Sequence, residues 1–261
     1  MKKILFILIS SLFISCQFDL TEKANVSNLK TYYDKEKKNL KEERTTFKLG
    51  NIIKGTSKVY FKNGNLMSEG SIKADSSSKN VIQEGDWKFY HESGELMSEG
   101  EFKANEKTGY WVQYYKDGKI ASEGNYKAGK ETKQWKYYYE NGQLQQEINF
   151  VDGNPNGLIK DYFPNGKVKA KSVLKNGVPN GLTTLYRENG NVASQINYVD
   201  GKMKGIYREY HENGKLSTEG HWNINNPIGE MKSYTEKGEL QSIYIIDSVG
   251  EITSEKILIK E

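Results

Sequence analysis

The chain is poor in the residues on which most catalytic, metal-binding and disulfide-stabilised proteins depend. Its 261 residues include one Cys, three His and four Pro. One Cys excludes a disulfide framework and a cysteine zinc site. Only 36% of the residues are hydrophobic and 18 of these are Tyr, so the large aliphatic core of an α/β enzyme is not expected. A formal net charge of +4, with no basic block beyond the N-terminal segments, argues against nucleic acid as a partner.

Tyr and Gly are present in excess. Aromatic residues make up 12% of the sequence, which is too many for a chain that stays disordered. The 25 Gly and 18 Tyr together indicate a sheet-rich protein with many tight turns.

The N-terminus has the organisation of a secretory signal. Lys2 and Lys3 precede an apolar run from Ile4 to Ile14 that is interrupted only by two serines. This run is shorter than the roughly 20 residues of a membrane-spanning helix and has the length of a signal-peptide core. The only Cys, Cys16, follows the small residue Ser15, where cleavage is expected.

The segment Phe13-Ile14-Ser15-Cys16 resembles the lipobox of bacterial lipoproteins. The resemblance implies that residues 1–15 are a signal peptide and that Cys16 is lipidated, first on its sulfur and then on its new amino group. Gln17 in place of Asp implies sorting to the outer membrane of the cell envelope. Phe13 departs from the usual Leu, and a plain secretory signal with an incidental Cys is the alternative.

The segment after Cys16 lacks turn signals. Residues 17–46 contain no Gly or Pro, and Asp34–Arg44 is almost entirely charged. Leu29, Tyr33 and Leu40 would share one face of a helix, but this stripe is thin. We therefore expect residues 16–46 to form a lipid-anchored polar tether or a marginal helix, with a partner-binding helix as the alternative.

An internal repeat dominates the rest of the chain. Glycines recur every 24 residues from Gly94 to Gly238, and an interval of 30 precedes them because six extra residues lie within 74–82. Four residues before each turn glycine stands a Tyr: Tyr60, Tyr90, Tyr114, Tyr138, Tyr162, Tyr186, Tyr210 and Tyr234. A second glycine opens every unit except one, which has Lys133. Such self-similarity is the signature of a repeat architecture.

Each unit has the pattern of a β-hairpin. Its central dipeptide is Asn-Gly in five units, as at Asn141-Gly142, which favours a two-residue type I′ turn. That turn fixes the register. It pairs Tyr139 with Leu144, Lys136 with Glu147, and Trp135 with Ile148. The sequence thus predicts an all-β fold, an elongated single-layer antiparallel meander of about eight 24-residue hairpins within 47–247.

The register sorts the side chains into two faces. We expect the inner face to carry Trp135, Tyr137, Tyr139, Leu144 and Phe150, and the other face to carry Lys136, Tyr138 and Glu147. Opposite charges then pair across the hairpins, at Lys58–Glu69, Lys88–Glu99 and Arg208–Glu219. Lys160 opposite Lys171 breaks this pattern.

The ends of such a sheet need protection because edge strands present unpaired backbone groups. Ser248-Val249-Gly250 turns the chain once more, and we expect residues 248–261 to form a C-terminal capping strand. Phe47–Lys54 is expected to protect the other end.

The unit resembles the bacterial variant of the MORN repeat. The shared pattern is Gly-x-Trp-x-x-Tyr-Tyr-x-Asn-Gly-x-Leu-x-x-Glu-Gly, clearest at 85–100 and 109–124, and the resemblance covers about residues 50–247. It implies a rod of β-hairpins with a role in protein scaffolding or phospholipid contact. Some bacterial members are described as antitoxins.

A search for catalytic chemistry finds no arrangement that repeats do not explain. His91 and His211 share one position beside the turn glycine, where other units have Tyr or Phe, so we expect hairpin surface residues. No His pair has metal-ligand spacing, and there is no Gly-x-Ser-x-Gly elbow and no phosphate-binding loop. We therefore expect no enzyme activity, no cofactor and no metal.

The tyrosine column is the sharpest positive feature. Amphipathic aromatic side chains on a flat surface are typical interface anchors, which would hold an extended protein or a glycan. The alternative is that these tyrosines shield the sheet and pack against their neighbours. The sequence predicts a non-catalytic cell-envelope lipoprotein whose rod binds a protein or serves as a scaffold. An antitoxin-like protein and a phospholipid-binding rod are the alternatives.

Overall fold

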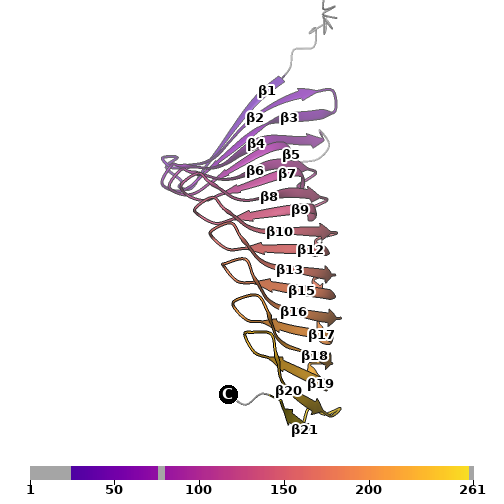
Figure 1. Cartoon of the computed structure of the whole chain (residues 1–261). Helices are drawn as coiled ribbons and strands as arrows, with labels where there is room; N and C mark the ends of the chain where they lie inside the picture. The colour runs from indigo at the N-terminus through magenta and orange to yellow at the C-terminus, as the bar shows by residue number, and fades with distance from the viewer. Residues whose placement is uncertain (1–24, 76–79, 259–261) are drawn as a thin grey trace, which may run out of the picture.

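The computed structural model describes residues 25–75 and 80–258, and every regular element in this part of the chain is a β-strand. All strand pairings are antiparallel and follow the order of the chain, which produces one open sheet. Figure 1 shows the strands stacked one after another, with β1 and β21 at opposite ends of a long twisted ribbon. The predicted single-layer antiparallel meander is confirmed.

The strands have the following bounds: β1 (Asn25–Tyr32), β2 (Leu40–Leu49), β3 (Ile52–Tyr60), β4 (Leu66–Asp75), β5 (Ile82–Tyr90), β6 (Leu96–Lys103), β7 (Glu106–Tyr114), β8 (Ile120–Lys127), β9 (Lys130–Tyr138), β10 (Leu144–Val151), β11 (Asn154–Pro155), β12 (Gly157–Tyr162), β13 (Val168–Lys175), β14 (Val178–Pro179), β15 (Gly181–Tyr186), β16 (Val192–Val199), β17 (Lys202–Tyr210), β18 (Leu216–Asn223), β19 (Asn226–Tyr234), β20 (Leu240–Ile246) and β21 (Ile252–Ile257). Strand β10 pairs with both β11 and β12, and β13 with both β14 and β15, so each of these two pairs is one interrupted strand. At about 4.8 Å per strand the sheet is about 85 Å long.

The predicted tether or helix at 16–46 is wrong where the structure describes it. Residues 25–32 and 40–49 form the hairpin β1–β2, and β2 pairs with β3 to extend the sheet. The charged segment provides the turn, because the Asp34 carboxylate accepts the N–H groups of Lys38 (2.9 Å) and Asn39 (2.7 Å). Charged side chains are common on strands near a sheet edge, which explains why composition misled the prediction. Cys16 and the signal peptide lie outside the described residues.

The hairpin turns differ from the predicted type I′ geometry. Gly142 N–H donates to the Tyr139 carbonyl (2.8 Å) and Tyr139 N–H donates to the Gln143 carbonyl (2.9 Å). Gly142 has a φ of +85°, whereas Asn141 is not among the positive-φ residues. This is the three-residue loop in which a type I turn is followed by a left-handed glycine bulge. Leu144 therefore pairs with Tyr138, and not with Tyr139 as predicted.

Type I′-like turns occur instead in the connections between hairpins, at the opposite ends of the strands from the hairpin turns. Asp152 and Gly153 have φ values of +50° and +81°, and Val151 pairs with Asn154 across this two-residue loop. The same arrangement recurs at Asn176-Gly177 and Asp200-Gly201.

Away from the turns the predicted register is confirmed. Trp135 pairs with Ile148 and Lys136 with Glu147. The predicted ion pairs form at Lys58–Glu69 (3.4 Å), Lys88–Glu99 (3.6 Å) and Arg208–Glu219 (3.5 Å).

The core lies on one face, which we call the tryptophan face. Trp111 and Trp135 are 0% and 1% exposed. Ring contacts link Trp87, Phe89, Phe102, Trp111, Tyr126, Trp135, Tyr137 and Phe150 into one continuous cluster. A single-layer sheet thus buries its aromatic side chains against one another along the rod rather than against a second layer.

Each tryptophan packs over a glycine of the preceding hairpin. A Cβ atom on Gly124 would lie 2.2 Å from Trp135 Cδ2, and Gly100 and Gly70 are equally close to the next tryptophan. In the repeat that has Thr183 in place of tryptophan, the glycine is replaced by the larger Ser172. Thr183 Oγ1 donates to Ser172 Oγ (3.0 Å).

The unit-opening glycines occupy bulges. Gly109, Gly157, Gly205 and Gly229 have φ values of +67°, +86°, +102° and +70°. Lys133, the one departure in sequence, keeps the same left-handed conformation with φ +59°, and the β8–β9 register shifts between Glu123 and Asn125 at this bulge.

Strand β21 lies within the predicted C-terminal capping segment and pairs with β20. All six of its residues are exposed.

Candidate binding surface

The face opposite the tryptophans carries the tyrosine column, and we call it the tyrosine face. Six of the eight phenols donate to a side-chain oxygen on the preceding hairpin, fifteen residues earlier in five cases and twenty-one residues earlier for Tyr90. These bonds join Tyr90 to Glu69 (2.8 Å), Tyr114 to Glu99 (2.7 Å), Tyr138 to Glu123 (2.6 Å), Tyr162 to Glu147 (2.7 Å), Tyr210 to Gln195 (2.9 Å) and Tyr234 to Glu219 (2.8 Å). The column therefore fastens each repeat to the one before it.

The electrostatics of this row favour neutral donors and ionised acceptors. Burial, together with the hydrogen bond to a glutamate, raises the pKa of Tyr90, Tyr114 and Tyr162 to about 12. Burial disfavours the charge of Glu123, but hydrogen bonds from Tyr110 and Tyr138 outweigh it and leave the pKa of Glu123 below its ordinary value. At neutral pH these are charge-assisted hydrogen bonds.

The exception at Lys160 and Lys171 has a structural explanation. Lys171 stands where other repeats have the acceptor glutamate, and its Nζ lies 5.4 Å from the ring centroid of Tyr186, the column residue it faces. Lys160 turns to its other neighbour and forms an ion pair with Glu147 (3.7 Å). The two lysines pair in register on β12 and β13 without a carboxylate between them.

A second column, one residue after the tyrosines, also joins successive repeats. Its side chains bond to the backbone carbonyl of the next column tyrosine: Tyr115 to Tyr138 (2.5 Å), Tyr139 to Tyr162 (2.7 Å), Arg187 to Tyr210 (2.6 Å) and His211 to Tyr234 (2.7 Å). His211 bonds through Nε2, which requires the Nε2–H tautomer. His91 Nε2 is buried without a partner among the described residues. Both histidines lie beside hairpin turns, but they are half-buried and not surface residues as predicted.

Sequence reasoning missed the role of this second column. The signal was present as a recurring Tyr, Phe, His or Arg at one repeat position. Its chemical variety hid a shared geometry, because Tyr, His and Arg side chains can all donate to a carbonyl, whereas the Phe side chains at this position cannot.

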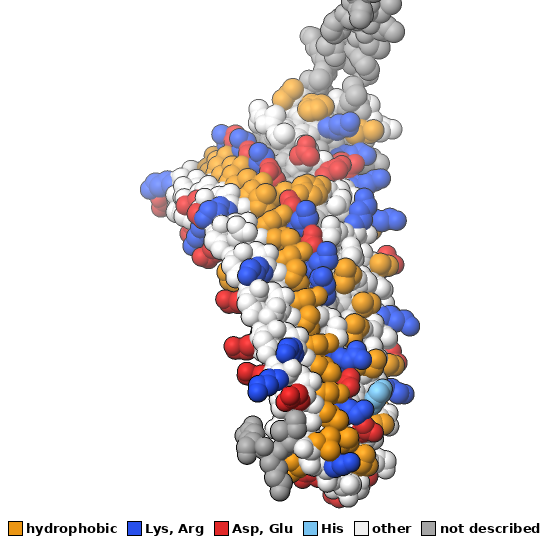
Figure 2. Space-filling model, viewed as in Figure 1, with side chains coloured by type: hydrophobic (Ala, Val, Ile, Leu, Met, Phe, Trp, Pro, Cys, Tyr) orange, Lys and Arg blue, Asp and Glu red, His pale blue; other side chains and the backbone are white. Residues whose placement is uncertain are grey.

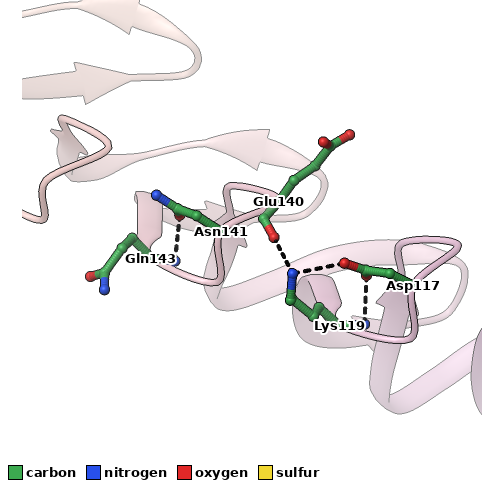
Figure 3. A network of polar contacts seen from close by, with 5 residues as sticks. All are labelled: Asp117, Lys119, Glu140, Asn141 and Gln143. Atoms are coloured by element: carbon green, nitrogen blue, oxygen red, sulfur yellow. Dashed lines mark hydrogen bonds and ion pairs between the residues drawn. The ribbon is translucent and has the colours of Figure 1, made fainter.

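The hairpin turns are also joined to the next repeat by hydrogen bonds from side chains to backbone carbonyls (Figure 3). Lys119 Nζ bonds to the Glu140 carbonyl of the next repeat (2.8 Å) and pairs with Asp117 within its own turn (2.8 Å). Asn141 Oδ1 accepts the N–H of Gln143 (2.9 Å) and closes its own turn. Asparagine amides of other turns donate to carbonyls one repeat on, as Asn213 does to Glu236 (2.9 Å).

Two absences concern residues 25–75 and 80–258. No group of three His, Cys, Asp or Glu side chains is placed to hold a metal ion. This part of the chain also contains no helix of the length and apolarity needed to cross a membrane.

The predicted site residues have different outcomes. Cys16, the predicted lipidation site, lies outside the described residues. The tyrosine column is half-buried and most of its hydroxyls are engaged within the sheet, which favours the packing interpretation over that of free interface anchors.

Seven segments match the family model described as MORN repeat variant: residues 54–74, 83–104, 107–128, 131–152, 155–176, 179–200 and 203–223. Together they cover more than half of the chain. No curated protein matches the sequence.

Proposed function

Because the chain belongs to the family of MORN repeat variants, whose repeats are generally linked to protein or membrane-lipid binding, we propose that it is a non-catalytic cell-envelope lipoprotein whose rod binds a protein partner. Cys16 anchors the chain to the outer membrane. The sheet presents its tyrosine face to the partner.

The observation that carries this proposal is the combination of internal fastening and exposed apolar surface. Hydrogen bonds between repeats hold the sheet without a second layer, so both faces reach solvent. Leu158, Leu182 and Ile206 occupy the same position in three successive repeats and are 44%, 46% and 42% exposed. Contiguous exposed apolar side chains mark interaction surfaces in soluble domains.

Anchoring is tested by metabolic labelling with palmitate. We expect label on the wild-type protein, none on Cys16→Ala, and undiminished label on the signal-peptide control Ser11→Ala. An unlabelled wild-type protein released in soluble form would contradict the anchor.

Partner binding is tested by chemical cross-linking in native envelopes, with the full chain as bait. We expect one partner protein to be cross-linked to residues of the tyrosine face, at about one partner molecule for each cross-linked chain. The lipid alternative predicts a different result. The Cys16→Ala chain would then sediment with vesicles of phosphatidylglycerol and phosphatidylcholine, and no protein would be cross-linked.

A further inference from the structure

An apolar row crosses the tyrosine face over β12–β17. Its members are Leu158, Leu182 and Ile206, which occupy the position eight residues before the turn glycine on the alternate strands β12, β15 and β17. On the strands between them, Val173 (39% exposed) lies opposite Leu158 and the polar Asn197 lies opposite Leu182. In the first four repeats the same position carries Thr56, Asp86, Tyr110 and Gln134. The apolar row is therefore confined to the C-terminal half of the rod. Figure 2 shows hydrophobic side chains lying among lysines and arginines beside the long hydrophobic stripe.

The neighbouring row of the same face changes character over the same strands. It consists of cross-strand partners that read Lys160, Lys171, Thr184, Gln195 and Arg208. No carboxylate interrupts these five positions, whereas Glu69, Glu99, Glu123 and Glu147 alternate with other residues in the preceding repeats.

The charge of this region is correspondingly positive. Glu147 and Glu219, at the two margins, pair with Lys160 (3.7 Å) and Arg208 (3.5 Å). Lys171 has the ring of Tyr186 but no carboxylate partner among the described residues. Residues 155–178 contain five Lys and a single Asp, and that Asp161 bonds to Gln146 on the opposite face.

The spacing of the row selects the shape of an occupant. Leu158, Leu182 and Ile206 follow one another at every second strand level, which is about 9.6 Å. Residues i and i+7 of an α-helix are about 10.5 Å apart, whereas alternate residues of a strand are about 6.7 Å apart. A helix lying across the strands thus matches the row better than a strand does.

We infer that the apolar row and the adjacent cationic row form a docking surface for an acidic amphipathic helix of a partner protein. This inference rests on the proposed protein-binding function and assigns it a place and a partner chemistry. Leucine-like side chains at i, i+3, i+4 and i+7 contact the apolar row. Glutamates on the flank of the helix face Lys171, the cation of this row that has no carboxylate partner among the described residues.

A second copy of the chain is a poor occupant. Packing two tyrosine faces together about a twofold axis would bring Lys160 and Lys171 of one copy against the same lysines of the other, and like charges oppose such contact.

The test uses the full chain and a fluorescent helical peptide of about 15 residues with Leu at i, i+3, i+4 and i+7 and Glu at its flanks. A twin peptide carries Lys in place of Glu. In anisotropy titrations we expect the acidic peptide to bind at least tenfold more tightly than the twin, and more weakly as salt is raised. Equal binding of the two peptides would overturn the inference.

Variants locate the site. The triple variant Leu158→Thr/Leu182→Thr/Ile206→Thr, which installs the residue found at Thr56, is expected to weaken acidic-peptide binding at least tenfold. The matched control is Ile245→Thr on β20, outside the apolar row. It removes a side chain of similar exposure (40%) from the tyrosine face and should leave binding unchanged. Retained binding by the triple variant would overturn the inference.

A second variant guards against loss of folding. Lys171→Glu restores the acidic residue found at this position in the first four repeats, so it is expected to fold and still to weaken acidic-peptide binding several-fold. Unchanged binding would overturn the inference. The outcome is separable from that of the proposed function. A native partner that the triple variant still binds would rule out this docking surface alone, whereas absence of any native partner would rule out the protein-binding function.

Discussion

At the scale of single residues, the tyrosine column shows how one position couples neighbouring repeats. Tyr138 donates to Glu123 of the preceding hairpin (2.6 Å), and its backbone carbonyl accepts the phenol of Tyr115 (2.5 Å). The same residue thus contributes its side chain to one bond and its backbone to another. Removing it affects the contact between repeats rather than the repeat itself.

Tyr138→Phe deletes only the hydroxyl and is expected to lower the free energy of unfolding by about 1–2 kcal/mol, because a bond to an ionised, partly buried carboxylate is lost. Tyr186→Phe is the matched control, since Lys171 replaces the acceptor there, and its effect should stay within about 0.5 kcal/mol. Urea denaturation measures both. Equal losses would show that the hydroxyl bond contributes little.

Alkaline pH should destabilise the fold through the same column. The folded-state pKa of Tyr90, Tyr114 and Tyr162 is raised to about 12 from 10.0, so the folded protein holds these protons more tightly than the unfolded chain. The resulting stability is complete below pH 10 and is lost as the pH rises toward 12. Ultraviolet titration of tyrosinate should show a late-titrating group that disappears in urea. A single transition near pH 10 in the native protein would contradict this.

At the scale of the element, each repeat needs two different turns. The hairpin turn uses one left-handed glycine, and the connection to the next hairpin uses two left-handed residues followed by a bulge. Both ends contain Asn-Gly or Asp-Gly, so the dipeptides alone did not distinguish them. The intervals between strands predicted where the chain reverses, but the bulge that offsets Tyr138 and Leu144 has no signature in residue spacing.

Lys133 offers a test of the bulge geometry. A non-glycine residue with left-handed φ costs about 1–2 kcal/mol. Glycine loses about 0.5–1 kcal/mol more conformational entropy on folding, so Lys133→Gly is expected to raise the free energy of unfolding by about 0.5–1 kcal/mol. Lys136→Gly, in the regular part of β9, should lower it by about as much. Thermal denaturation compares them, and destabilisation by both changes would refute the strain at Lys133.

The tryptophan–glycine contact should show strong coupling. Gly124→Ala forces a methyl group against the Trp135 indole and is expected to cost about 1–3 kcal/mol. Trp135→Ile copies the smaller residue Ile159 of the next repeat. In that background Gly124→Ala should lower the free energy of unfolding by less than about 1 kcal/mol. A double-mutant cycle in urea gives the coupling energy, and additive effects would contradict the contact.

At the scale of the whole molecule, periodicity decided what the sequence predicted. Eight in-phase tyrosines and glycines were sufficient to predict the meander, the register away from the turns and three ion pairs. The N-terminal hairpin was missed because β1 and β2 lie outside the periodic segment and their charged turn at Asp34 resembles a solvated tether. The fastening role of the tyrosines was left open by the sequence, since a column of aromatic side chains fits both an interface and an internal clamp until the acceptors Glu99 and Glu123 are located.

The rod is therefore uniform in how it is held together and non-uniform in what it presents. The carboxylate ladder of the first four repeats stops at Glu147, and apolar and cationic rows replace it over β12–β17. A rod built from equivalent repeats can vary its surface locally because the bonds between neighbours use other positions.

Site-specific photo-cross-linking in native envelopes tests this account most directly. A benzoylphenylalanine is placed at Leu182 in the apolar row and, in a matched protein, at Gln134, the equivalent position two repeats earlier. The account predicts that Leu182 cross-links a protein whose captured peptide is acidic and has leucine-like residues at helical spacing, and that Gln134 does not. Equal capture at both positions, or a captured peptide that is basic or lacks that spacing, would contradict it.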